Sequence, residues 1–275
     1  MLERLGERRP SDSTVSDPLV AGVLGAYREY WLRALLSDEP AAAHEGWLLE
    51  RLNRLTSEAG GATAATLDDL EPGLDSLIGA RGHHVLLGVT SPLRELMLWR
   101  TETEERYDVP LPDGVQPVTV MFMDDFASLG WAGFATCGRS HSGGWTRPDR
   151  LYAVRSAYDV ASEEFRVSYL AHEAQHFADN RRYPDLDRQD ELEYRAKLTE
   201  LAVARGTLYD LLDGFARNVS DARGVPHSYA NGRVVRGLAA RLLADSGSAP
   251  AWRTAPPERI REAARELLRE DTARR

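Results

Sequence analysis

The residues best suited to chemistry lie together in His172-Glu173-Ala174-Gln175-His176. On a helix, residues four apart are neighbours on one face, so two imidazoles at this spacing can bind one metal ion. The glutamate beside the first histidine would lie near the open coordination position of that ion. It could accept a proton there from a bound water that zinc has already acidified. The spacing therefore predicts a hydrolytic metal centre on a helix.

The flanking sequence favours a helix over about residues 162–179. Apolar residues recur at helical spacing and form one stripe: Val167, Leu170, Ala171, Ala174, Phe177 and Ala178. On a helical wheel, at about 100° per residue, His172 and His176 fall roughly opposite this stripe. We therefore expect the helix to pack its apolar side into the core and to turn both histidines toward a cleft.

A catalytic zinc site needs a third protein ligand, and the next helix can supply it. A turn closed by Pro184 is followed by Asp187, a candidate N-cap, and then by a helix predicted over about 188–215.

Within that helix, Glu193 shares its face with Ala196 and Glu200. A small residue one turn after a ligand lets two helices approach closely, which favours Glu193 as the ligand. Glu191 points to nearly the opposite side, and its place near the helix start also suits an N-terminal charge. Glu191 and Glu200 remain the alternatives.

These residues resemble the gluzincin metallopeptidases, in which His-Glu-x-x-His on one helix is followed by a glutamate ligand on the next. That glutamate often begins a Glu-x-x-Ala-Asp or Glu-x-x-Ala-Asn run, and Glu193-Tyr194-Arg195-Ala196 matches its first part. The resemblance covers about Phe165 to Ala204. Lys197 stands where Asp or Asn is usual, so a different acid must accept a histidine ring N–H. The candidates are Asp179, Glu200 and Asp190.

The resemblance implies a zinc-dependent peptidase that acts on a peptide or protein substrate. One Zn²⁺ would be held by His172, His176 and Glu193, with Glu173 as general base. Gluzincins commonly place a Tyr or His across the metal from the base, where it stabilises the oxyanion. At a predicted helix start near residue 227, the candidates for this role are His227 and Tyr229.

The resemblance also implies a strand at the edge of a sheet, lying along the cleft and pairing with an extended peptide. The segment Leu151–Ser156, shortly before the motif helix, is the candidate. An interior strand with no free edge is equally consistent with this segment.

The whole chain is predicted to be α+β and zincin-like, with a small mixed sheet packed on the motif helix. Residues 1–80 form a helical segment, with helices expected over 17–37, 41–55 and 66–78. Residues 81–275 form the metallopeptidase domain, with a sheet over about 84–156 and helical C-terminal portions. The expected strands are 84–89, a hairpin of 93–101 with 107–111, then 117–123, 131–137 and 151–156.

Composition limits the classes of binding partner and the cellular compartment that we expect for this chain. The 275-residue chain has a net charge of −9 and no basic block, which argues against nucleic acid. A single cysteine, Cys137, excludes an intramolecular disulfide and is expected to pack within a strand. No window reaches the roughly 18 apolar residues of a membrane span, and the first residues lack a signal-peptide pattern. We expect a cytoplasmic protein.

A second hypothesis is a non-catalytic zinc-binding or partner-binding protein on a degenerate zincin scaffold. Lys197 supports it, whereas the intact Glu173 argues against it, because a site that only binds metal needs no base there. A third is that the motif is incidental and no metal binds. An open zinc position beside Glu173, as opposed to a fourth protein ligand, separates the first two hypotheses.

Overall fold

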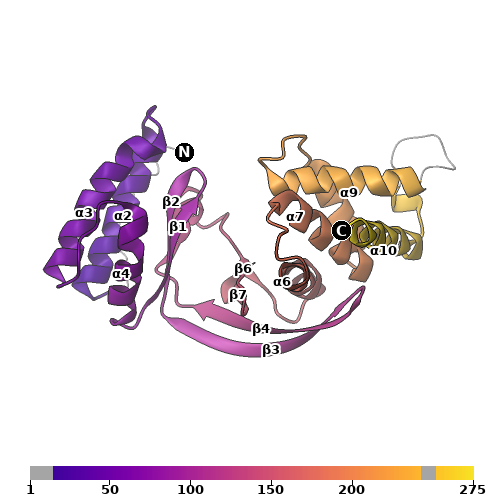
Figure 1. The fold of residues 1–275 in the computed structure, drawn as a ribbon, viewed down its shortest axis with the longest axis horizontal. Helices are drawn as coiled ribbons and strands as arrows, with labels where there is room; N and C mark the ends of the chain where they lie inside the picture. Colours follow the sequence, from indigo (N-terminus) through magenta and orange to yellow (C-terminus); the bar gives the residue numbers. More distant parts are fainter. Residues whose placement is uncertain (1–14, 243–251) are drawn as a thin grey trace. The chain divides into compact units, whose positions relative to one another are not determined.

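The computed structural model describes residues 15–242 and 252–275 and has an α+β fold (Figure 1). Its contacts divide the chain into two compact units, Met1–Thr103 with Met123–Gly143, and Glu104–Phe122 with Gly144–Arg275. The boundary expected near residue 80 differs from this division, because strand β1 (His84–Thr90) packs on helix α4 (Leu67–Gly79) of the first unit. None of the described helices is both long and apolar enough to cross a membrane.

The first unit contains the three helices predicted near the N-terminus. They are α2 (Pro18–Leu36), α3 (Glu45–Glu58), which follows the 3₁₀ turn η1 (Ala41–His44), and α4. The Asp17 carboxylate accepts hydrogen bonds from the backbone N–H groups of Leu19 and Val20, so the predicted N-cap is confirmed. The Thr66 hydroxyl caps α4 in the same way, by accepting from the N–H of Asp69.

The first unit also holds a three-stranded sheet in the order β1-β2-β5, with β2 at Leu93–Trp99 and β5 at Ser128–Leu129. Strands β1 and β2 are antiparallel over their whole length. The predicted hairpin of 93–101 with 107–111 is therefore wrong, because β2 pairs with the preceding strand instead.

The strand predicted over 131–137 is also wrong, since helix α5 (Gly130–Ala135) lies there. Gly130 adopts a left-handed φ of 85° directly after β5, and the Glu95 carboxylate accepts a hydrogen bond from the N–H of Trp131. These two features end the strand and cap the helix start. Cys137 consequently follows a helix, is exposed and has a φ of 57°.

The second unit holds a sheet in the order β3-β4-β7-β6. Its strands are β3 (Thr101–Leu111), β4 (Gly114–Asp124), β7 (Leu151–Val154) and β6 (Gly144–Thr146). The strand predicted over 117–123 is confirmed within β4, and two sheets replace the single one expected. Of the two possibilities for the segment 151–156, the interior strand is confirmed and the edge strand is not, because β7 lies between β4 and β6, and β6 forms the edge.

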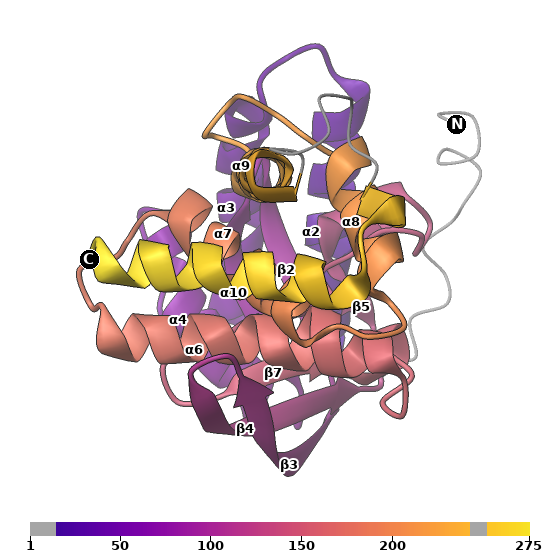
Figure 2. The ribbon, with the colours of Figure 1, turned by 90° about the vertical axis from the view of Figure 1, so that its right-hand side faces the viewer.

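The predicted motif helix is confirmed as a π-helical segment, η3 (Phe165–Ala171), that continues into α6 (His172–Arg182). It is followed by α7 (Gln189–Val203), α8 (Leu208–Arg217), α9 (Pro226–Leu242) and α10 (Pro257–Ala273), with short 3₁₀ turns at η2 (Arg155–Ala157) and η4 (Trp252–Thr254). Helices α6 and α10 run in nearly the same direction, and α9 crosses them (Figures 1 and 2).

The single helix predicted over 188–215 is wrong, because the chain breaks between α7 and α8. Ala204 is extended, and the backbone N–H groups of Arg205 and Gly206 donate to the Glu163 carboxylate instead of continuing the helix. The predicted cap is also wrong, since Arg188 rather than Asp187 occupies the N-cap position.

Helix α7 is the centre of the second unit, because α6, α9 and α10 all pack against it. Every residue from Leu192 to Ala202 is buried, on all sides of the helix. Four of these residues have acidic or basic side chains that are ordinarily charged at neutral pH: Glu193, Arg195, Lys197 and Glu200. Buried charges are costly unless they are paired or bind a metal. Each of these four side chains therefore needs a partner of opposite charge or a bound metal ion.

Candidate metal centre

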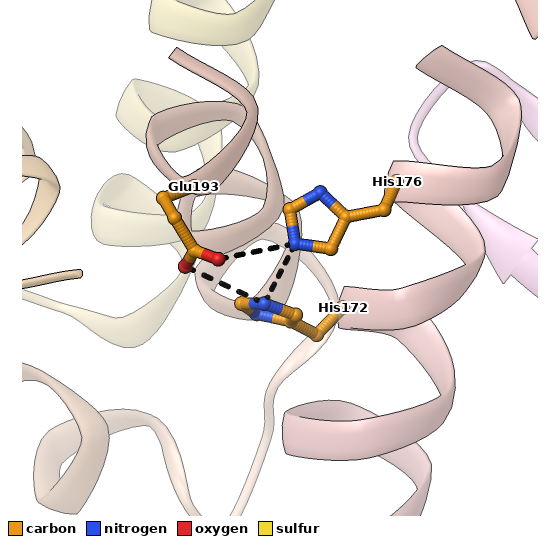
Figure 3. A group of neighbouring side chains, drawn as sticks. All are labelled: His172, His176 and Glu193. Carbon is orange, nitrogen blue, oxygen red and sulfur yellow. Dashed lines mark hydrogen bonds and ion pairs between the residues drawn. The ribbon is translucent and has the colours of Figure 1, made fainter. Parts of the chain in front are cut away.

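Helices α6 and α7 bring the three predicted ligands together. His172, His176 and Glu193 are all buried, and one ligand atom from each lies within 4.8 Å of the others (Figure 3). All three residues belong to the second unit. Helical spacing places both imidazoles on one side of α6, and α7 presents the carboxylate to them.

The separations between these atoms suit a metal ion. The two histidine Nε2 atoms lie 3.0 Å apart, Glu193 Oε1 is 3.4 Å from Nε2 of His176, and Glu193 Oε2 is 3.6 Å from Nε2 of His172. Donor atoms bound tetrahedrally to zinc at about 2.0–2.1 Å lie roughly 3.3 Å from one another. The two nitrogens and the Glu193 carboxylate, with a different oxygen facing each nitrogen, are therefore close to the spacing of three protein ligands in a zinc site.

Glu200 orients the first histidine. Its Oε1 lies 2.7 Å from Nδ1 of His172, so this nitrogen donates its proton, and in the neutral imidazole Nε2 has the lone pair that faces the centre. Glu200 lies seven residues after Glu193 on the same face of α7. A lysine at position 197 therefore does not deprive His172 of its carboxylate partner.

The other two acids considered for this role have different partners. The Asp179 carboxylate accepts two hydrogen bonds from Arg195, at 2.8 and 2.9 Å. The Asp190 carboxylate pairs with Arg188 at 2.8 Å. Of the three candidate acids, Glu200 is therefore the one that accepts a hydrogen bond from a ring nitrogen of His172.

Both histidines present Nε2 to the same point, which favours a cation there. With Nδ1 of His172 donating to Glu200, its Nε2 is an acceptor that faces Nε2 of His176 at 3.0 Å. Nδ1 of His176 is buried and has no hydrogen-bond partner within the described residues. In the metal-free protein one of these nitrogens donates to the other, whereas a metal ion between them would bind both lone pairs and also satisfy the Glu193 carboxylate.

The electrostatics of the metal-free centre agree with this arrangement. Burial alone would lower the pKa of His172, but its hydrogen bonds to Glu193 and Glu200 raise that pKa to about 10. Burial would raise the pKa of Glu193, but hydrogen bonds from His172, His176 and His227 outweigh it and hold the pKa well below its ordinary value. At neutral pH the metal-free centre therefore holds a proton on His172 beside an ionised carboxylate.

Metal binding is consequently expected to release about one proton near pH 7, because a bound imidazole must be deprotonated. Since the pKa of His172 in the folded metal-free protein is about 10, the dissociation constant for zinc should fall as pH rises toward that value. Calorimetric titrations with zinc in buffers of different ionisation enthalpy measure the proton count. A binding enthalpy that does not depend on the buffer would contradict this expectation.

Glu200→Gln is expected to weaken zinc binding about 10-fold, because partners that orient a ligating histidine typically contribute 10–100-fold. The glutamine amide keeps an acceptor for Nδ1 of His172 but loses the negative charge. The matched control is Glu191→Gln on the same helix, whose carboxylate pairs with Arg188 and Arg275. Competition with a fluorescent zinc chelator measures both affinities. If both variants lose the same amount of zinc affinity, Glu200 has no specific role in the centre. If only Glu191→Gln loses zinc affinity, Glu191 becomes the candidate ligand.

Glu173 lies in the first turn of α6, is half-buried and stands outside the group of three ligands. Its Oε2 accepts a hydrogen bond of 2.5 Å from the hydroxyl of Thr146 on β6. Thr146 was not identified from the sequence, because this residue lies outside every strand and helix predicted there. Only the pairing of β6 with β7 brings its hydroxyl to the motif helix.

The two residues predicted to stabilise an oxyanion differ in position. His227, in the first turn of α9, is 67% exposed, and its Nδ1 lies 2.7 Å from Glu193 Oε2. The Tyr229 ring lies under the Arg223 guanidinium at 5.4 Å, and no described contact joins it to the three ligands. The structure thus brings His227, but not Tyr229, to the centre.

Lys197 also lies beside the third ligand. Its Nζ is 3.9 Å from Glu193 Oε2 and 4.8 Å from the centroid of the Phe215 ring. The ammonium partly compensates the buried carboxylate, which is a different role from that of the acid usual at this position of the resembled motif.

Comparisons of the chain with models of protein families, with curated proteins and with solved structures gave no match.

Proposed function

We propose that this protein is a zinc-dependent metallopeptidase with a zincin-like fold of the gluzincin type. The observation that carries the proposal is the convergence of His172 Nε2, His176 Nε2 and the Glu193 carboxylate, with Glu173 beside them but outside the ligand group. Three protein ligands leave the fourth position of a tetrahedral zinc site open, which is the pattern of a catalytic rather than a structural site.

Zinc at this centre would acidify a bound water and polarise the scissile carbonyl of a peptide or protein substrate. Glu173 would be the residue that accepts a proton from water on its carboxylate and returns it to the leaving amine, so the proton balance would close. Glu200 keeps the Nε2 lone pair of His172 directed at the centre. His227, exposed beside Glu193, is the candidate to stabilise the oxyanion.

The same histidine supports an alternative, a non-catalytic zinc-binding or partner-binding protein. Because His227 lies beside Glu193 and is exposed, a change of its side-chain rotamer could place its ring at the fourth position. A zinc ion closed by four protein ligands would have no position for water.

Metal content and peptide cleavage test the proposal together. Protein purified without chelator and dialysed against zinc is expected to hold about one zinc per chain by elemental analysis. It should cleave members of a mixed peptide library, detected by mass spectrometry, and should lose and regain cleavage when zinc is removed and restored. Protein that takes up no zinc would contradict the proposal. Bound zinc without cleavage, together with weaker zinc binding in His227→Ala, would support the alternative.

A further inference from the structure

We infer that Thr146 is a positioning residue that holds the carboxylate of Glu173 in its working orientation. This inference rests on the proposed function and assigns a role to strand β6, the edge of the second unit's sheet.

The contact has the geometry of a strong hydrogen bond. Thr146 Oγ1 lies 2.5 Å from Glu173 Oε2 and 3.3 Å from the main-chain oxygen of Glu173. Separations of about 2.5–2.7 Å are typical of a hydroxyl that donates to an ionised carboxylate. Because the hydroxyl has one proton and directs it at Oε2, the Oε1 atom of Glu173 remains an acceptor for the proton of a water.

The pairing of β6 with β7 explains why this threonine faces the motif helix. The two strands are antiparallel, with Gly144 opposite Ala153 and Thr146 opposite Leu151. Alternate residues of a strand face the same side, so Gly144 and Thr146 lie on the same face of the sheet as their partners Ala153 and Leu151. Leu151 and Ala153 are buried on that face and pack with residues of η3 and α6.

Gly144 allows β6 to come this close. A Cβ atom built at Gly144 would lie 2.6 Å from Cε2 of the Tyr169 ring on η3, and 2.3 Å from the carbonyl oxygen of Tyr152. No side chain fits at these distances. A glycine two residues before Thr146 thus permits the strand to lie against the helix, and that approach brings the hydroxyl to Glu173.

Orientation matters because the glutamate side chain has three rotatable bonds and Glu173 is half-buried. A general base must lie within hydrogen-bond reach of the proton it removes. A displacement of about 1 Å at a reacting group can cost on the order of 10²-fold in rate. Fixing one carboxylate oxygen from β6 restricts these rotations without a contact to the metal ligands.

The test compares Thr146→Val, which keeps the shape and removes the hydroxyl, with Thr146→Ser, which keeps the hydroxyl. We expect Thr146→Val to lower kcat by about 10–100-fold, with KM and zinc content unchanged, and Thr146→Ser to restore most of it. The matched control is Thr207→Val. Its hydroxyl also faces a glutamate, at 3.5 Å from Glu163 Oε1, but outside the centre, so kcat should not change.

A second readout does not depend on turnover. Side-chain couplings of Glu173 in selectively labelled protein should report one rotamer in the wild type and rotamer averaging in Thr146→Val. Identical couplings in the two proteins would overturn the inference even if kcat had fallen. Absence of peptide cleavage by the zinc-loaded wild type would instead reject the proposed function, while the couplings would still decide the role of Thr146.

Discussion

Glu173→Gln is expected to bind zinc as the wild type does and to lose about 10²–10⁴-fold in kcat, the usual contribution of a general base. The amide has the shape of the carboxylate, and its oxygen can still accept the hydrogen bond from Thr146. It cannot take a proton from water. Because Glu173 stands outside the group formed by His172, His176 and Glu193, the ligands remain in place.

Zinc stoichiometry and steady-state kinetics on one preparation of the variant separate binding from chemistry. His172→Ala provides the contrast, since it removes a ligand and should lower both zinc content and activity. Glu164→Gln is the matched control, because it removes an exposed carboxylate of the same segment. Full turnover by Glu173→Gln would reject Glu173 as the base. Loss of zinc from that variant would show that Glu173 supports the centre instead of acting on the water.

The elements that were predicted correctly are those whose determinants are local. The N-caps Asp17 and Thr66 lie next to the helices they start, so spacing alone located α2 and α4. The pairing of strands was not predicted, because a strand's partner depends on residues distant in the sequence. A short apolar run does not separate strand from helix, and the helix at α5 is decided by the distant Glu95.

The same distinction applies to the metal centre. Helical periodicity placed Glu193 and Glu200 on one face of α7, which favoured Glu193 over Glu191 as the candidate ligand and offered Glu200 as one of three candidate partners of His172. The contact between Thr146 and Glu173 spans 27 residues and requires the register of β6 on β7. No periodic pattern encodes that register. Contacts between elements, unlike those along one helix face, therefore had to come from the structure.

Helix α7 is also unusual for a helix rich in charged residues, because it is buried on every side from Leu192 to Ala202. Arg195 is the clearest case, with a side-chain exposure of only 1%. Its Nε and Nη2 donate to both Asp179 oxygens, and its Nη1 donates to Asp271 Oδ2 and Thr272 Oγ1, each at 3.0 Å. One guanidinium thus joins α6, α7 and α10.

Arg195→Met is accordingly expected to lower the free energy of unfolding of the second unit by about 3–5 kcal/mol, the usual cost of removing one partner from a buried ion pair. The methionine fills part of the volume but leaves the buried Asp179 carboxylate, 1% exposed, without its cation, and the Asp271 carboxylate, 5% exposed, with Arg275 but without Arg195. Urea unfolding followed by circular dichroism measures the loss, and hydrogen exchange of α6, α7 and α10 amides assigns it to this unit.

The triple variant Arg195→Met, Asp179→Asn, Asp271→Asn distinguishes an unpaired charge from lost packing. If the cost arises from two buried carboxylates, neutral amides should recover part of the lost free energy. The matched control is Arg259→Met on the exposed face of α10, which should change stability by less than about 0.5 kcal/mol. If Arg195→Met also changes the free energy of unfolding by this small amount, water must reach the carboxylates of Asp179 and Asp271. Because Asp179 lies one turn after His176, a large effect would instead make this ion-pair cluster the support that fixes the motif helix against the helix carrying Glu193.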